Sequence, residues 1–456
     1  MKSFFFVILS FVLFTFILFS CGSEIQEEVK LEEEVVPDEG ENNEETPEES
    51  NGTPNILFVI TDDMGLDATP GYAIGNTKPN MPNLQNLIDN GIRFNNLWSS
   101  PTCSPTRATI LTGKYSHRNG VVKVTDYLST THTSLQSYIA SETNNIYSSA
   151  VFGKWHLSNS ASHPNDMGVS HFAGSSGGGL PSYTGWTLNI NGQTQFSSEY
   201  ATTKITDLAI DWIEDQTKPW FAWVAYNAPH TPFHLPPTTL HSQGTLPTDQ
   251  ASIDANPLPY YMAMIEAVDT EYGRLTASLT EDTIENTIII FIGDNGTPNQ
   301  VLQEYAFRHG KGSTYEGGIN VPMIISGNGV TRINDSEDAL IGTSDLYATI
   351  ASIAGVNVST IHDSYNFKDL LTSTTNANQR EYAFVLDGND DGTINYTIRN
   401  TSHKYVQLAN GNEQFFDLLD DPLENTNLLG NNQPALNSTE SSIKSDLISE
   451  MNSLLN

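Results

Sequence analysis

The stretch Asn55–Asp63 reads NILFVITDD, a continuous apolar run that ends in two acids. A short run of this kind is typical of a strand that is buried on both of its faces. A second run of the same kind, Thr287–Ile292, is followed by Gly293–Gly296, which reads GDNG. The two runs predict strands of a parallel sheet whose carboxyl ends carry oxygen ligands.

The rest of the folded region alternates between strand and helix patterns. Further apolar runs lie at residues 149–152, 220–225 and 321–325. Apolar side chains at helical spacing lie between the runs, at residues 83–90, 198–216, 259–279 and 343–354. This alternation predicts an α/β fold with a mostly parallel sheet that is flanked by helices.

The sequence changes in character after about Ser373. Short strand-like runs follow, joined by Gly, Asn and Asp turns, at residues 382–386, 393–399, 405–408 and 414–418. We therefore expect a main domain over residues 55–373 and a small C-terminal antiparallel α+β subdomain over residues 374–456.

The N-terminus resembles an export signal. Lys2 precedes a mostly apolar run, Phe4–Phe19, which is shorter than the ~20 residues that a membrane-spanning helix needs. Leu18–Gly22 is similar to a bacterial lipoprotein cleavage site, which implies a signal peptide over residues 1–20 and a lipid on Cys21. A true membrane anchor is the alternative. We expect a lipoprotein of the bacterial cell envelope, in the periplasm or on the outer-membrane surface.

The composition excludes some classes of protein. Residues 21–54 are rich in Glu and nearly free of large side chains, which predicts an acidic, disordered linker. The chain has 20 Lys and Arg against 54 Asp and Glu, a net charge of −34, so we expect no nucleic-acid partner. The only cysteines are Cys21 and Cys103. If Cys21 carries a lipid, Cys103 is a lone thiol in an oxidising compartment and calls for an explanation.

Side chains suited to catalysis and metal binding follow the predicted strands. In open parallel sheets, sites form beyond the carboxyl ends of the strands. Carboxylate and amide oxygens suit a hard cation such as Ca²⁺ better than zinc. The side chains at these strand ends are Asp62, Asp63, Lys154, His156, His230, Asp294 and Asn295.

Cys103–Lys114 reads CSPTRATILTGK and predicts a helix that starts at the lone thiol. Pro105 fits the first turn of a helix. Cys103 then lies at the helix N-terminus, where free N–H groups favour an anion. Arg107 follows four residues later, one helical turn away and close enough to reach back to Cys103. Such a thiol is a better candidate for chemistry than for packing.

Six ordered motifs closely resemble the formylglycine-dependent sulfatases of the alkaline phosphatase superfamily. The resemblance covers residues 55 to about 322, and Thr106, where many members have Ser, is a departure from the pattern. It implies an alkaline-phosphatase-like fold, with residues 55–373 as the sulfatase catalytic domain. The motifs are TDD at 61–63, Cys103-x-Pro-x-Arg107, GKWHL at 153–157, APHTP at 228–232, GDNG at 293–296 and KGSTYEGG at 311–318.

The resemblance implies a modified residue and a metal. A separate maturation enzyme would oxidise Cys103 to formylglycine, whose hydrate has two hydroxyl groups. One hydroxyl would attack sulfur, and the second would lose its proton as sulfate is expelled. Together with the oxygen of residue 103, the Ca²⁺ ligands would be Asp62, Asp63, Asp294 and Asn295.

The resemblance also implies roles for the remaining charged groups. Arg107 and Lys154 would oppose negative charge on the nucleophile and the sulfate. His230, with Lys311, would protonate the leaving oxygen, and His156 would deprotonate the second hydroxyl. His117, Arg118, Arg308 and His309 are candidate substrate contacts, while we expect Trp155, Tyr183 and Trp186 to pack in the core.

The function that we expect is hydrolysis of sulfate esters on sulfated polysaccharides or oligosaccharides, such as ulvan or sulfated galactans. Two alternatives remain. One is a phosphonate or phosphate ester hydrolase of the same superfamily, because phosphate and sulfate are close in shape. The other is an inactive glycan-binding protein of the cell surface.

Overall fold

A computed structural model describes residues 52–376 and 379–456 of this chain. The expected signal peptide, Cys21 and the expected linker up to residue 51 lie outside the described residues. Residues Gly52–Asn456 form one compact unit, within which the expected boundary between 373 and 374 falls. Of the helices in the described part, none is both long and apolar enough to cross a lipid bilayer.

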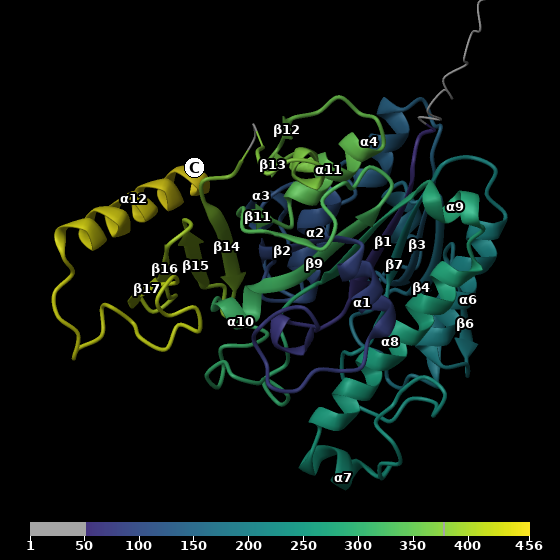
Figure 1. The fold of residues 1–456 in the computed structure, drawn as a ribbon, viewed down its shortest axis with the longest axis horizontal. Coiled ribbons are helices and arrows are strands. Elements are labelled where there is room, and N and C mark those ends of the chain that lie inside the picture. Colours follow the sequence, from purple (N-terminus) through teal and green to yellow (C-terminus); the bar gives the residue numbers. More distant parts are fainter. Residues whose placement is uncertain (1–51, 377–378) are drawn as a thin grey trace, which may run out of the picture. The chain divides into compact units, whose positions relative to one another are not determined.

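An 11-stranded sheet runs through the middle of the molecule (Figure 1). Its centre is parallel, in the order β8-β1-β7-β3-β4, whereas β2, β5, β6 and β9 make antiparallel pairs. The expected mostly parallel sheet is therefore confirmed. The strands are β1 (Asn55–Thr61), β2 (Gly91–Trp98), β3 (Ser148–Lys154), β4 (His171–Ser175), β5 (Trp186–Ile190), β6 (Gln193–Ser197), β7 (Trp220–Ala225), β8 (Thr287–Gly293), β9 (Asn320–Gly327), β10 (Asp335–Glu337) and β11 (Ile341–Gly342).

Helices cover both faces of this sheet because its strands are apolar on both sides. Leu57 and Val59 of β1 pack into one core, under α1 (Pro82–Asp89), α6 (Ala201–Glu214) and α8 (Leu258–Ser278). Ile56, Phe58 and Ile60 of the same strand pack into the other core, under α2 (Cys103–Thr112), α4 (Leu135–Glu142) and α11 (Asp345–Ile353). Alternate residues of one strand thus serve two cores.

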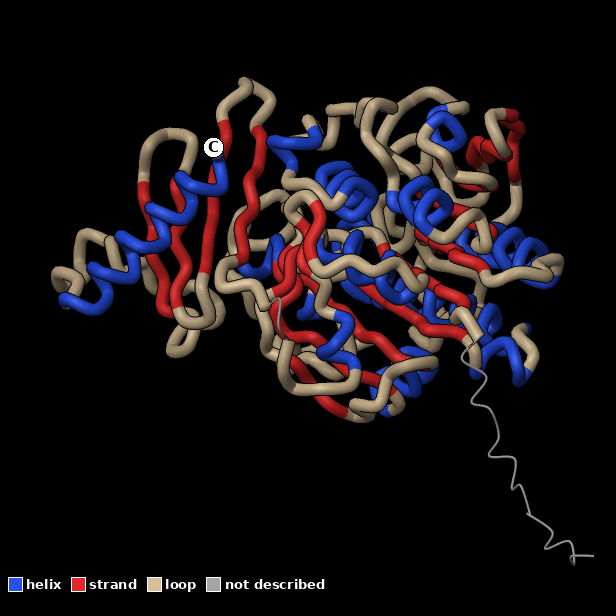
Figure 2. Tube along the Cα trace, turned by 90° about the horizontal axis from the view of Figure 1, so that it is seen from above, coloured by secondary structure: helices blue, strands red, loops and turns tan. Residues whose placement is uncertain are grey.

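The C-terminal part is a separate four-stranded antiparallel sheet, as expected from its sequence. Helix α12 (Ser438–Leu455) crosses the strands, as Figure 2 shows. Asn437 and Glu440 form a capping box that starts this helix. The strands are β14 (Ala383–Gly388), β15 (Ile394–Arg399), β16 (His403–Gln407) and β17 (Glu413–Asp417).

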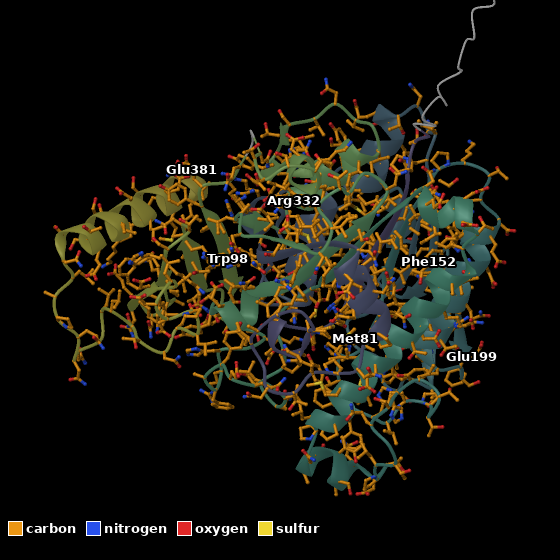
Figure 3. The ribbon with its side chains drawn as sticks, viewed as in Figure 1. Met81, Trp98, Phe152, Glu199, Arg332 and Glu381 are labelled. Atoms are coloured by element: carbon orange, nitrogen blue, oxygen red, sulfur yellow. The ribbon has the colours of Figure 1, made fainter. Side chains whose placement is uncertain are left out.

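The two sheets meet around Trp98, at the end of β2 (Figure 3). Trp98 shares a small core with Ala383 and Val385 of β14. Beside it lies a buried group of four charges, which includes the first residue of α10 (Glu316–Ile319). We call this group the junction cluster, and its members are Glu316, Arg399, Lys404 and Glu424.

Candidate active site

Four neighbouring strands bring the expected site residues to one edge of the sheet. β1 pairs in parallel with β8 on one side and β7 on the other, and β7 pairs in parallel with β3. Thr61 lies opposite Gly293, and Gly153 lies opposite Ala225, so the chain leaves all four strands on the same edge. The side chains there are Asp62, Asp63, Lys154, His156, His230, Asp294 and Asn295.

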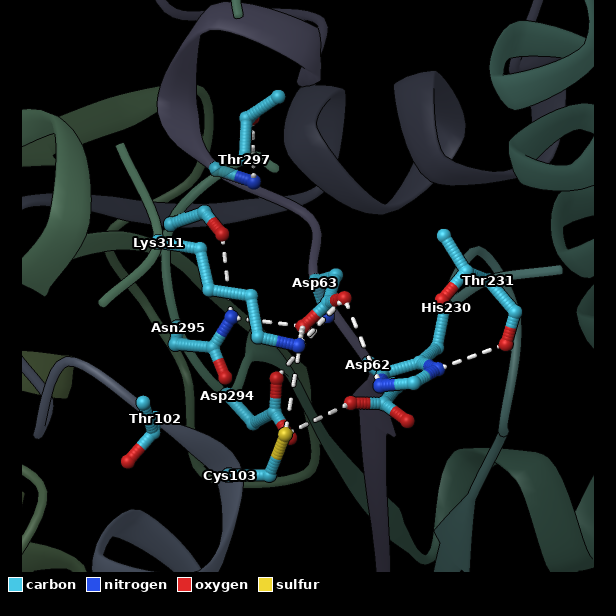
Figure 4. A network of polar contacts seen from close by, with 12 residues as sticks. Asp62, Asp63, Thr102, Cys103, His230, Thr231, Asp294, Asn295, Thr297 and Lys311 are labelled. Atoms are coloured by element: carbon cyan, nitrogen blue, oxygen red, sulfur yellow. Dashed lines mark hydrogen bonds and ion pairs between the residues drawn. The ribbon is translucent and has the colours of Figure 1, made fainter. Parts of the chain in front are cut away.

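Cys103 is the first residue of α2, with Thr102 as the helix N-cap. The residue is 1% exposed, its thiol donates a hydrogen bond to Asp62 Oδ1 over 3.3 Å, and Asp63 Oδ1 lies 4.0 Å from the sulfur (Figure 4). Burial, together with the charge of Asp62, raises the pKa of the Cys103 thiol well above its usual value. The unmodified side chain is therefore a neutral thiol that faces two carboxylates.

Ion pairs between three acids and three bases surround Cys103. Lys154 Nζ lies 2.6 Å from Asp62 Oδ2, and Lys311 Nζ lies 2.6 Å from Asp63 Oδ1. A guanidinium nitrogen of Arg107 lies 2.9 Å from Asp294 Oδ2. We call these six residues the active-site cluster: Asp62, Asp63, Arg107, Lys154, Asp294 and Lys311.

The pairing keeps the bases of this cluster charged. Burial alone would lower the pKa of Lys154, but Asp62 raises it above its ordinary value. At Lys311, burial likewise lowers the pKa and the charge of Asp63 raises it, so that the net pKa lies above its ordinary value. The bases therefore stay charged inside the site, and each is paired with a carboxylate.

Arg107 has different partners from the one that helical spacing suggested. The spacing placed it within reach of Cys103. In the structure it contacts Asp294, and a second guanidinium nitrogen donates to the backbone carbonyl of Lys154 over 2.9 Å. Because the guanidinium is a rigid planar fork, Arg107 ties the end of β3 to the chain that follows β8.

The donor set at this edge fits a hard cation. Asn295 Nδ2 donates to Asp63 Oδ1 over 2.8 Å, and the Asp63 backbone N–H donates to Asp294 Oδ1 over 3.0 Å. Asn295 Oδ1 is buried and has no hydrogen-bond partner among the described residues. An unpartnered buried oxygen beside three carboxylates is what a Ca²⁺ ligand requires. Candidate ligand atoms within 4.8 Å of one another come from Asp62, Asp63, Cys103 and His230. His230 was not expected in this set, and Asp294, which was expected, is not part of it.

Two histidines border the site. His230 Nδ1 lies 2.8 Å from the Thr231 carbonyl oxygen, so Nδ1 carries the hydrogen, and Nε2 lies 3.9 Å from Asp63 Oδ2. His156 is held with a φ of 56°, and its Nδ1 is buried without a partner in the described part of the chain. Burial, followed by the charge of Lys154, lowers the pKa of His156 to about 2. His156 is therefore neutral, and one of its ring nitrogens has a free lone pair.

The site opens into a pocket of about 640 Å³. Lys311 and His230, each with a side chain 21% exposed, lie where the buried cluster meets this pocket. Other walls come from the start of α2 and from the loops that follow α3, β4 and β8. The lining residues are Thr102, Cys103, Val124, His156, Gly178, Gly179, His230, Pro298, Asn299, Gln300, Lys311 and Gly312.

The four candidate substrate contacts are not among these lining residues. Arg118 pairs with Asp363 and donates to the Leu454 carbonyl, and His117 packs against Tyr115 and Phe384. Those contacts join α3 (Ser116–Asn119) to the C-terminal part. The other two residues also contact neighbouring rings, since His309 stacks on Tyr315 and Arg308 lies over Phe307.

Two buried tyrosines support the site, and sequence reasoning did not assign them this role. Tyr261 of α8 donates to the backbone carbonyl of Asp63 over 2.8 Å, next to the φ of 75° that turns the Asp63 side chain into the site. Tyr183 donates to the carbonyls of Asn227 and His230 over 2.8 and 2.7 Å. Tyr183 was expected to pack in the core, which it does, but nothing local in the sequence indicates these long-range hydrogen bonds.

Comparisons with known proteins identify a family model and relatives that match this chain. Residues 54–356, more than half of the chain, match the family model described as Sulfatase. The Ulvan-active sulfatase of Formosa agariphila is 26% identical over 411 residues, which are 83% of this chain and 77% of the relative. The uncharacterized sulfatase YdeN of Escherichia coli (strain K12) is 27% identical over 374 residues, 69% of this chain but only 65% of YdeN.

A solved structure has the same fold. The crystal structure of Ps i-CgsB in complex with k-i-k-neocarrahexaose superposes with a TM-score of 0.76 and 23% identity. The match covers 88% of this chain and 92% of that chain, so it includes the C-terminal part as well as the main sheet.

Proposed function

This chain belongs to the sulfatase family, and on that premise we propose that it hydrolyses sulfate esters of carbohydrates. Sulfatases are sulfuric ester hydrolases, which release sulfate and an alcohol. The observation that carries the proposal is the active-site cluster, which surrounds Cys103 and opens into a pocket of about 640 Å³.

The charges of the site suit an anionic substrate once a cation is bound. The three carboxylates of the active-site cluster match its three bases, so the cluster is formally neutral. We propose that Asp62, Asp63, Asp294 and Asn295 hold Ca²⁺ beside residue 103. A Ca²⁺ held there would supply Lewis-acid polarisation of the sulfate group. Its positive charge would also attract an ester that the net charge of −34 repels at long range.

Residue 103 is the proposed nucleophile, after conversion of Cys103 to formylglycine by a separate maturation enzyme. The hydrated aldehyde would supply an attacking hydroxyl and a second hydroxyl that allows sulfate to leave. Two features support this role: the N-terminus of α2 favours an anion at this position, and Lys154 and Lys311 lie close enough to oppose negative charge.

The two histidines are the proposed proton carriers. His230 keeps a hydrogen on Nδ1 through Thr231, and in its doubly protonated form it would pass the second proton, from Nε2, to the leaving alcohol oxygen, with Lys311 beside it. His156 lines the same pocket and is the proposed acceptor of a proton from a hydroxyl at residue 103.

The proposed substrate is a sulfated oligosaccharide or polysaccharide of the algal kind, such as ulvan or a sulfated galactan. One relative carries the name Ulvan-active sulfatase, and Ps i-CgsB shares the fold and binds a neocarrahexaose. The pocket is large enough to admit a sugar ring beside the sulfate group.

The test is sulfate release by enzyme that is co-produced with a maturation enzyme. A panel of sulfated oligosaccharides from ulvan and carrageenan should yield free sulfate, and aryl sulfate should be cleaved faster than the matched aryl phosphate and phosphonate. Preference for a phosphorus ester would replace the proposal with phosphate or phosphonate ester hydrolysis. Binding of the oligosaccharides without any ester cleavage would replace it with a glycan-binding role.

We further propose that the chain is exported and carries a lipid on Cys21. The support is the sequence alone, because the residues concerned lie outside the described part. Cys21→Ala should release soluble protein or leave the precursor unprocessed. Unchanged membrane association after this substitution would instead favour a hydrophobic anchor.

A further inference from the structure

Two consecutive glycines lie against the two histidines of the site. Gly178 and Gly179 belong to the segment that leaves β4, and both line the pocket. β4 lies beside β3, where Ser175 is opposite Lys154. The backbone N–H of His156 donates to the Ser176 carbonyl over 3.2 Å, so this segment follows the chain that carries His156.

Gly178 has no room for a side chain. A Cβ at this position would lie 2.3 Å from His156 Nε2 and 2.4 Å from Cε1, well inside van der Waals contact. Its φ is outside the left-handed region, so backbone freedom does not explain the glycine. The absent Cβ leaves the space in which the imidazole of His156 lies.

Gly179 has room for a side chain, but the space belongs to the pocket. A Cβ there would meet only His230 among the described residues, at 3.4 Å from Cε1 and 3.7 Å from Nδ1. Both distances are ordinary contacts, so a larger residue could be accommodated without moving the ring. Its side chain would fill the part of the pocket beside His230, where the leaving alcohol would lie.

The segment is fixed on both sides of the glycines. Asn189 Nδ2 donates to Ser176 Oγ over 3.0 Å, and the Trp155 N–H donates to the Ser175 carbonyl over 2.9 Å. On the other side, Tyr183 donates to the His230 carbonyl over 2.7 Å. The glycines therefore have a defined position between the two histidines.

We propose that Gly178 positions His156 and that Gly179 determines which leaving alcohols the site accepts. This inference rests on the proposed function and specifies its substrate class. Gly178 leaves room for the Nε2 edge of the imidazole against the backbone. Gly179 keeps free the volume that a sugar ring needs beside His230, whereas a side chain there would favour smaller alcohols.

The positioning role of Gly178 is tested first by stability, which does not depend on catalysis. Gly178→Ala should lower the melting temperature by roughly 2–8 °C, because the methyl group overpacks against His156. In a protein that already carries His156→Ala, the same substitution should leave the melting temperature almost unchanged. An equal loss in both backgrounds would overturn the proposed contact, whether or not the protein is a sulfatase.

Kinetics then test both glycines. In enzyme with converted residue 103, Gly178→Ala should lower kcat about 100-fold on aryl sulfate and oligosaccharide alike, with little change in KM. Gly179→Val should lower the kcat/KM for a sulfated oligosaccharide at least about tenfold relative to that for 4-nitrophenyl sulfate. Gly177→Ala is the matched control, because nothing in the described structure lies within 4 Å of its Cβ.

Three results would overturn the inference. One is a kcat for Gly178→Ala that equals the value for Gly177→Ala. Another is a ratio of kcat/KM for the oligosaccharide to kcat/KM for 4-nitrophenyl sulfate that Gly179→Val does not change. The third is oligosaccharide cleavage that improves in Gly179→Val. An enzyme that cleaves only phosphorus esters would contradict the proposed function but leave the stability result for Gly178 and His156 intact, so the two failures are distinguishable.

Discussion

The active-site cluster and the junction cluster are both buried and both balanced in charge, yet they differ in access to solvent. In the junction cluster, Lys404 and Glu424 have side chains 0% exposed, and the cluster is closed by Trp98. In the active-site cluster, Lys311 faces a pocket, and Asn295 Oδ1 beside it lacks a partner in the described structure. Buried, paired charges are thus common to both clusters, whereas an open face distinguishes the active-site cluster.

A substitution in the closed junction cluster should lower the stability of the protein. Lys404 pairs with Glu316 and Glu424 at 3.2 and 2.7 Å, so Lys404→Met removes the cation of Glu424 and leaves Glu316 with Arg399 alone. We expect a loss of about 3–5 kcal/mol in the free energy of unfolding. Urea unfolding measures it, and Lys444→Met, at an exposed pair with Glu413, is the control with little effect. A loss no larger than in the control would remove the distinction between the sites.

A substitution in the open active-site cluster should lower the rate of catalysis. Lys154→Met removes the cation 2.6 Å from Asp62 and so removes positive charge beside residue 103. We expect kcat to fall about 10²–10³-fold, which corresponds to roughly 2.7–4 kcal/mol of transition-state stabilisation. Sulfate release in steady state is the measurement. In contrast, the folded fraction of the Lys404→Met protein should keep a far higher kcat, and equal kcat losses in the two variants would contradict the comparison.

A bound cation should stabilise only the open cluster. Ca²⁺ at 100 times its Kd should add about 2.7 kcal/mol to the free energy of unfolding. Thermal unfolding with Ca²⁺ and with a chelator measures the difference. Asp294→Asn should reduce the gain, and Glu424→Gln in the junction cluster should leave it intact. A melting temperature that does not respond to Ca²⁺ in the wild-type protein would speak against the metal site.

The smallest effect is a pH dependence of stability that arises in the junction cluster. Burial raises the pKa of Glu424 to about 7 from its ordinary 4.5, with Lys404 acting in the opposite direction and Glu316 adding to the rise. The folded protein therefore holds this proton more tightly than the unfolded chain does. The contribution of Glu424 to stability is complete below about pH 4.5 and is lost as the pH rises through about 7.

Melting temperatures across this pH range measure the effect. We expect the melting temperature to fall by roughly 2–4 °C from this group as the pH rises, and Glu424→Gln should flatten the slope. Glu413→Gln is the matched control, because Lys444 holds the pKa of that exposed carboxyl below its ordinary value. The account of Glu424 is wrong if both variants keep the wild-type slope.

The sequence predicted the centre of the fold better than its margins. Strands β1, β7 and β8 are buried on both faces, so their residues form continuous apolar runs that are visible without a structure. Strand β6 reads QTQFS and is mostly exposed, so no apolar pattern marks it. The direction of β9, antiparallel to β8, depends on the connection between them and not on its local sequence. A helix was expected in the α+β C-terminal subdomain, but the position of α12 was not predicted although Asn437–Glu440 carries a capping-box pattern.

The sequence likewise predicted some residues of the site and left the long-range contacts of others unpredicted. Asp62 and Asp294 were found because each directly follows an apolar run, and parallel neighbours end at one edge. The partners of Arg107 and the hydrogen bonds of Tyr183 join residues that are far apart in the chain, so no spacing rule reaches them. The role of Gly178 is the hardest to predict from the sequence, because it depends on which ring lies against this residue.

The most direct test of the central claim is the number of sulfate ions that each enzyme molecule releases. Converted wild-type enzyme should release many, and a peptide that contains residue 103 should have the mass of an aldehyde or its hydrate. Cys103→Ser keeps one hydroxyl but lacks the second, so it should release at most one alcohol per molecule and retain sulfate at position 103. Full multiple turnover by Cys103→Ser would contradict the account.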